Sequence, residues 1–130
     1  MMQAASLLYV ITRDPAYLDD AQRLAESCSR HFFTTVREGD SDVVLLKNGS
    51  IWFTAILMRG FEELYKIDGN SRYIDVFRNT LIRLWTKGQD KTGLFNSAIL
   101  SESFHFANTH KWLQTQGALI EMYARLAGME

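Results

Sequence analysis

A repeated pattern of residues constrains the fold of this chain more than any other feature of its sequence. The runs 8–11 and 17–19 are followed, 56 positions later, by the similar runs 64–67 and 73–75. A third copy begins at Met122, again with a tyrosine next to it. Repeats of this length are typical of helical hairpins, which stack because one hairpin cannot bury its apolar faces alone. The repeat therefore predicts stacked pairs of helices.

Hydrophobic periodicity predicts five helices, at about 3–12, 15–35, 50–67, 71–86 and 110–127. The first and third are apolar on nearly every side, whereas the second and fourth carry a single apolar stripe. We therefore expect the first and third to be inner helices, covered by the second and fourth as an outer layer. We also place the fifth in the inner layer.

The predicted fold class is all-α, and inner and outer antiparallel hairpins of this kind are the unit of an (α/α)6 toroid. Residues 1–130 are expected to form one segment of such a toroid, in a single domain.

Composition excludes several classes of protein. Apolar residues make up 47% and charged residues 22%, which excludes a disordered chain. A net charge of -1 without a basic cluster argues against a nucleic-acid partner. Cys28 is the single cysteine, so neither an internal disulfide nor a cysteine-based zinc site is expected. No apolar run approaches the ~20 residues of a membrane span, and no secretory signal follows Met1. The sequence as given predicts a cytoplasmic chain with no membrane partner.

The lengths of the connections predict which end of the molecule carries function. The turns at 13–14 and 68–70 are short, whereas the connections at about 37–49 and 87–109 are long. Antiparallel packing places the short turns at one end of the molecule and the long connections at the other. Long loops on a rigid scaffold often carry binding residues. Carboxylate, amide and aromatic side chains suited to a sugar occur at or beside these connections: Asp42, Trp52, Glu102, His105, Asn108, His110 and Trp112. The alternative is a solvated polar loop, with Trp52 packed in the core.

Other chemistries have weaker signals. His105 and His110 are five positions apart, whereas two ligands on one helix face need about four, so no metal site is predicted. Residues 87–93 lack the spacing of a phosphate-binding loop, and no cofactor is expected. Arg59 lies within a mostly apolar helix, so we expect it to form an ion pair with a carboxylate.

Several runs of residues resemble the C-terminal part of glycoside hydrolase family 76, which contains α-1,6-mannanases. They are residues 52–60, 63–65, 85, 90, 93–95 and 111–116, and residues 3–27 look like the preceding hairpin of the same family. The resemblance implies an (α/α)6 toroid and an α-mannan-type polysaccharide or oligosaccharide as substrate.

The resemblance also implies a catalytic pair of adjacent aspartates, expected upstream of the part that this chain resembles. Asp19 and Asp20 are the one adjacent pair here, and we predict that they form the solvated start of the second helix, away from the long loops. The catalytic residues therefore remain unassigned, and the chain alone is expected to be inactive. The alternatives are a carbohydrate-binding module without catalysis and a helical-repeat scaffold for protein partners.

The two ends of the predicted array lack partners. We expect no outer helix before the first helix within these residues, and none packed over the fifth. Exposed apolar faces of this kind usually bind something. The chain is therefore expected to be a fragment of a longer hydrolase, or to form a homo-oligomer through its first and last helices.

Overall fold

The computed structural model describes residues 1–95 and 111–129, which are mostly helical. The helices are α1 (Met2–Thr12), α2 (Pro15–Phe32), α3 (Ile51–Asp68), α4 (Arg72–Lys87) and α5 (Leu113–Gly128). A small sheet of two strands, β1 (Phe33–Glu38) and β2 (Ser41–Leu46), separates α2 from α3. The five helices lie within a few residues of the predicted ranges, which confirms the helical part of the prediction.

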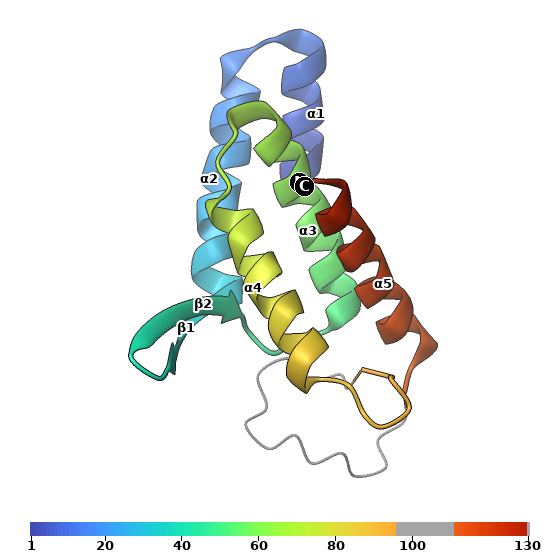
Figure 1. Ribbon diagram of the computed structural model, residues 1–130. Helices are drawn as coiled ribbons and strands as arrows, with labels where there is room; N and C mark the ends of the chain where they lie inside the picture. Colours follow the sequence, from blue (N-terminus) through green and yellow to red (C-terminus); the bar gives the residue numbers. More distant parts are fainter. Residues whose placement is uncertain (96–110, 130) are drawn as a thin grey trace.

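The helices form two layers (Figure 1). Helix α3 packs between α1 and α5, while α2 packs against α1 and α4 against α3. These layers match the predicted inner and outer sets. The short turns lie at the upper end of Figure 1, whereas the hairpin and the starts of α3 and α5 lie at the lower end. The predicted separation of short and long connections is therefore confirmed for the connection at 37–49, whereas residues 96–109 of the second connection lie outside the described residues.

The sequence repeat is also a repeat of hydrogen bonds. At the end of α1 the Arg13 amide donates to the Tyr9 carbonyl over 2.8 Å, and at the end of α3 the Gly69 amide donates to the Tyr65 carbonyl over 2.9 Å. Arg13 and Gly69 both adopt a left-handed conformation, with φ of 61° and 67°. Two helices thus end in the same way, 56 residues apart.

The helices that follow these turns also begin alike. The Asp14 carboxylate accepts from the Ala16 amide over 3.0 Å, and the Asn70 side-chain oxygen accepts from the Arg72 amide over 3.2 Å. Such side chains satisfy amides that the first helical turn leaves unpaired. In both turns, a side-chain oxygen therefore binds the amide two residues further along the chain.

The centre of the core is aromatic. The Phe61 ring on α3 lies 4.8 Å from the Tyr73 ring, 5.6 Å from the Phe33 ring and 5.8 Å from the Phe77 ring, measured between centroids. Phe61 and Phe77 are fully buried. The cluster joins α3 to α4 and to the first residue of the hairpin, so it fixes the position of the hairpin as well as the helix packing.

The hairpin corrects the all-α prediction, which extended the second helix to 35 and treated 37–49 as a loop. The strands pair from Phe33 with Leu46 to Glu38 with Ser41, which leaves a two-residue turn. Gly39, the first turn residue, has φ of 62°, a conformation favourable for glycine in tight hairpin turns. The centre of β1 holds Thr34, Thr35 and Val36, and β2 holds Val43 and Val44; such branched side chains favour extended backbone over a helix.

Helix α4 holds the hairpin in place. The Leu46 amide donates to the Thr80 hydroxyl over 3.0 Å, and this hydroxyl donates to the Val76 carbonyl over 2.8 Å. Arg83 forms an ion pair with Glu38 on the other strand. The contacts of Leu46 with Thr80 and of Glu38 with Arg83 each join residues more than 30 positions apart. The local sequence pattern therefore did not predict where the hairpin packs.

Both ends of the helical array expose apolar side chains. Leu7, Leu8, Val10 and Ile11 are exposed on α1, and Leu113 and Ile120 are exposed on α5. The expectation of uncovered terminal helices is therefore confirmed within the described residues. None of the helices described is both long and apolar enough to cross a membrane.

Candidate functional site

A cavity lies where α2 ends and α3 begins, at the lower end of the molecule in Figure 1. We call it the α3 cavity; it has a volume of about 670 Å³. Its walls come from the end of α2, the end of β2 and the first turns of α3: His31, Phe32, Leu46, Lys47, Asn48, Gly49, Ser50, Phe53, Thr54 and Leu57. The long connection that the sequence singled out therefore helps to form a concave surface.

Aromatic rings are prominent in the α3 cavity. The Phe53 side chain is 68% exposed, and Phe32 is also exposed. The Phe32 ring meets the His31 ring edge to face at 4.6 Å between centroids. Exposed rings beside a concave surface offer flat apolar platforms, which the C–H face of a sugar ring can cover.

The backbone around the α3 cavity is fixed by local hydrogen bonds. The Lys47 amide donates to the Phe32 carbonyl over 2.7 Å, which ties the end of β2 to the end of α2. The Ser50 carbonyl accepts from both the amide and the hydroxyl of Thr54, over 3.1 and 3.2 Å. These hydrogen bonds fix the wall of the α3 cavity at the start of α3. Among the described residues, no aspartate or glutamate lines this cavity.

Three of the sequence-predicted site residues lie within the described part of the chain, at two different places in the fold. Trp52 starts α3 and Trp112 precedes α5, so both lie at the lower end of the molecule, and Trp112 is 67% exposed. Asp42 lies near the hairpin turn, pairs with Arg37 at 3.2 Å and lines a different groove, between α2 and α4. Glu102, His105, Asn108 and His110 lie outside the described residues.

Asp90 lies in the turn after α4, and its carboxylate accepts hydrogen bonds from that turn. One carboxylate oxygen accepts from the Thr92 hydroxyl over 2.6 Å, the Thr92 amide over 2.8 Å and the Leu94 amide over 3.2 Å. The other lies 3.6 Å from the Lys111 amine. The hydrogen bond from the Thr92 hydroxyl is the main cause of a lowered pKa for Asp90. The hydrogen bonds from Thr92 and Leu94 hold this turn closed around the Asp90 carboxylate.

Gln116 joins the same turn to α5. Its side-chain amide accepts from the Phe95 amide over 3.0 Å and donates to the Phe95 carbonyl over 2.8 Å. The structure shows that it binds the backbone of the connecting segment.

An ion-pair network joins α3 to α5, and it confirms the expectation for Arg59. The Arg59 guanidinium forms two hydrogen bonds to the Glu121 carboxylate, over 2.6 and 2.7 Å. Arg125 binds the same carboxylate over 2.8 Å and Glu62 over 2.6 Å. Arg59 is the main cause that lowers the pKa of Glu121 to about 2. Sequence reasoning missed Glu121 because it lies 62 positions away from Arg59.

Asp19 and Asp20 lie on exposed turns near the start of α2, at the end of the molecule opposite the α3 cavity. Asp20 pairs with Arg23 at 2.7 Å, one turn along the same helix. Their placement confirms the prediction of a solvated helix start.

Comparison with solved structures gives matches over nearly the whole chain. A family 76 glycoside hydrolase from a bovine Bacteroides thetaiotaomicron strain matches 98% of this chain at 35% identity, with a TM-score of 0.89. The family 76 glycoside hydrolase (mannosidase) Bt3792 from Bacteroides thetaiotaomicron VPI-5482 matches 97% at 37% identity, with a TM-score of 0.87. The chain spans only 27% and 34% of the lengths of these two structures. No protein-family model and no curated protein matches the chain.

Proposed function

Since this chain is similar over nearly its whole length to one part of family 76 glycoside hydrolases, we propose that it is a section of such an enzyme. In this proposal it forms one wall of a cleft that binds an α-1,6-linked mannan or its oligosaccharides. The observation that carries the proposal is 35% identity at a TM-score of 0.89, over 98% of this chain and 27% of the other.

The α3 cavity is the proposed sugar-binding surface. Phe53 offers an exposed ring, and Lys47, Asn48 and Ser50 offer polar groups for sugar hydroxyls. Trp112 starts the neighbouring helix α5 at the same end of the molecule. In the proposal these residues hold a sugar chain across the starts of the two inner helices.

Cleavage requires more than this chain contributes. Glycosidic hydrolysis generally uses one carboxyl group as acid and a second as base or nucleophile. The described walls of the α3 cavity contain neither, and Asp19 and Asp20 lie at the opposite end. We place the catalytic pair in a part of the longer enzyme outside these 130 residues, so the chain alone binds without cleaving.

The exposed faces of α1 and α5 are proposed contact surfaces. In the longer enzyme they pack against further helices, whereas in isolation two copies of this chain pair through them. Light scattering at micromolar concentration is expected to show an oligomer. Ile11→Asp, at an exposed position on α1, is expected to shift the chain toward the monomer without a change in helical content. A stable monomer of the unaltered chain would refute the pairing.

Affinity electrophoresis in gels that contain α-1,6-mannan tests sugar binding. The chain is expected to migrate more slowly in mannan gels, and Phe53→Ala is expected to reduce this retardation. Tyr17→Ala, at the opposite end of the molecule, is the aromatic control and is expected to behave as the unaltered chain. Reducing-sugar release from the same mannan is expected to be absent. Turnover by this chain alone would overturn the placement of the catalytic pair, and unretarded migration would overturn the binding surface.

A further inference from the structure

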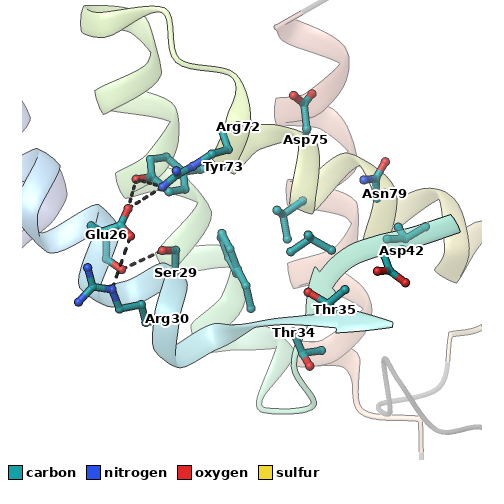
Figure 2. A pocket seen from close by; sticks show the side chains of 14 residues that line it. Glu26, Ser29, Arg30, Thr34, Thr35, Asp42, Arg72, Tyr73, Asp75 and Asn79 are labelled. Carbon is teal, nitrogen blue, oxygen red and sulfur yellow. Dashed lines mark hydrogen bonds and ion pairs between the residues drawn. The ribbon is translucent and has the colours of Figure 1, made fainter. Parts of the chain in front are cut away.

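A second concave surface lies on the outer layer, between α2 and α4 (Figure 2). We call it the outer groove; it has a volume of about 770 Å³. Glu26, Ser29 and Arg30 line it from α2, Asp75 and Asn79 from α4, and the hairpin closes its lower end. It shares no lining residue with the α3 cavity. Both bordering helices and the hairpin belong to this chain.

The two arginines that line the outer groove, Arg30 and Arg72, are both paired with Glu26. Glu26 accepts from Arg72 over 2.5 Å and from the Tyr73 hydroxyl over 3.1 Å, and it lies 3.5 Å from Arg30. Arg72 is the main cause of the lowered pKa of Glu26, so this carboxylate stays charged and holds both guanidinium groups. Asp42 and Asp75 also line the groove, and they pair with Arg37 and Arg78. Each charged side chain of the lining is therefore already ion-paired within this chain, so an anion such as phosphate meets no guanidinium that lacks a carboxylate partner.

The opposite wall presents groups that both donate and accept hydrogen bonds. Thr35 and Asp42 come from the two strands, and Asp75 and Asn79 lie one turn apart on α4 (Figure 2). Asp42 accepts from Arg37 over 3.2 Å, and Asp75 accepts from Ser71 over 2.9 Å and from Arg78, which still leaves each carboxylate with further lone pairs. No group of metal ligands was found within the described residues, which argues against a cation as the occupant.

Apolar side chains form the floor of the outer groove. Phe33 is half-buried against the Phe61 ring, Val76 is buried, and Val44 is exposed. A sugar has apolar C–H faces and a rim of hydroxyls that donate and accept. An apolar floor beside hydroxyl, amide and carboxylate groups matches that chemistry, whereas a purely apolar ligand would leave the polar wall without partners.

We propose that the outer groove is a second binding site for a neutral oligosaccharide, separate from the α3 cavity. The choice of an α-mannan fragment as the sugar rests on the proposed function, while the neutral polyol class rests on the groove itself. Such a site holds the polysaccharide on the outside of the helical array. The enzyme then retains the polysaccharide through a part of the sugar chain that lies away from the bond to be cleaved.

Amide chemical-shift mapping of the 130-residue chain with α-1,6-mannotriose tests the proposal. Signals of Thr35, Asp42 and Asn79 are expected to shift with saturation. The double variant Thr35→Ala/Asn79→Ala is expected to raise the Kd at this site about tenfold, because two hydrogen-bonding groups are lost. Thr86→Ala, on α4 outside the groove, is the control and is expected to leave the Kd unchanged. Phe53→Ala is expected to remove the shifts at the α3 cavity and keep those in the groove.

The outcomes separate the two sites. Shifts confined to the α3 cavity would overturn the outer-groove site and leave the proposed function standing. Shifts confined to the groove would support the outer site and contradict the α3 cavity as the sugar surface. No shift at either place would overturn both. Groove shifts with inorganic phosphate but not with mannotriose would overturn the neutral-sugar assignment.

Discussion

Glu121 lies at the centre of the ion-pair network between α3 and α5, and Glu121→Gln tests what the network contributes. The pKa of Glu121 falls from an ordinary value of 4.5 to about 2, chiefly through the hydrogen bonds from Arg59. At about 1.4 kcal/mol per pKa unit, this shift corresponds to an upper limit of about 3 kcal/mol. The Glu121 and Arg59 side chains are 26% and 35% exposed, so solvent screening lowers the expected loss to about 1–2 kcal/mol.

The stabilisation of the fold by the Glu121 carboxylate depends on pH. A carboxyl group whose pKa is lower in the folded state stabilises the fold above its unfolded pKa. That contribution is lost as the pH falls through the folded pKa, here about 2. The difference in unfolding free energy between the unaltered chain and Glu121→Gln is therefore expected to be full at pH 7. It decreases below about 4.5, the ordinary pKa of the group.

Urea denaturation followed by circular dichroism at several pH values measures this difference. Asp20→Asn is the matched control, because Asp20 also pairs with an arginine at 2.7 Å but on an exposed surface, where the two side chains are 52% and 79% exposed. The control is expected to cost less than about 0.5 kcal/mol. The reasoning is refuted if Glu121→Gln costs no more than the control, or if its cost stays constant down to pH 3.

Three further substitutions test other parts of the fold by the same denaturation assay. Phe61→Ala removes the central ring of the core and is expected to cost about 3–5 kcal/mol; a cost below about 1 kcal/mol would contradict its central role. Arg13→Gly is expected to gain up to about 1 kcal/mol, because Arg13 holds the left-handed conformation that Gly69 adopts without strain; a loss of stability would refute the equivalence of the two turns. Thr80→Val removes the hydroxyl that the Leu46 amide binds and is expected to cost about 1 kcal/mol. It is also expected to speed hydrogen exchange of that amide, and unchanged exchange would show that Thr80 does not hold the hairpin.

The sequence predicted the helices well because their signals are local. Helix α3 was expected at about 50–67 and runs from Ile51 to Asp68, and α4 was expected at about 71–86 and runs from Arg72 to Lys87. The apolar spacing, the capping residues and the repeat all lie within one or two turns of the helix they describe. The alternation of all-round apolar and one-sided helices also predicted the two layers.

The hairpin was missed although part of its signal was present. Gly39 and the valines of β2 favour a turn and a strand, but Phe33 continues the apolar spacing of α2. The ring of Phe33 packs on Phe61 and Phe77, so tertiary contacts decide where the helix stops. Local propensity is a weak guide where a buried ring fixes the backbone.

The structure separates the predicted site residues that it describes. Trp52 and Trp112 lie at the end of the molecule where α3 and α5 begin. The sequence grouped Asp42 with them, whereas the hairpin carries Asp42 to the outer groove. The direction of a hairpin depends on what it packs against, and its length alone does not reveal it.

The amino-acid sequence by itself determined the helices, their pairing into repeated hairpins and the need of Arg59 for a carboxylate. Only the tertiary structure decided that this carboxylate is Glu121, that Gln116 binds the backbone of Phe95, and that α2, α4 and the hairpin enclose a groove. The physical reason is the range of each interaction. Helix periodicity and capping act between residues a few positions apart, while ion pairs and grooves join positions tens of residues apart, for which no local pattern exists.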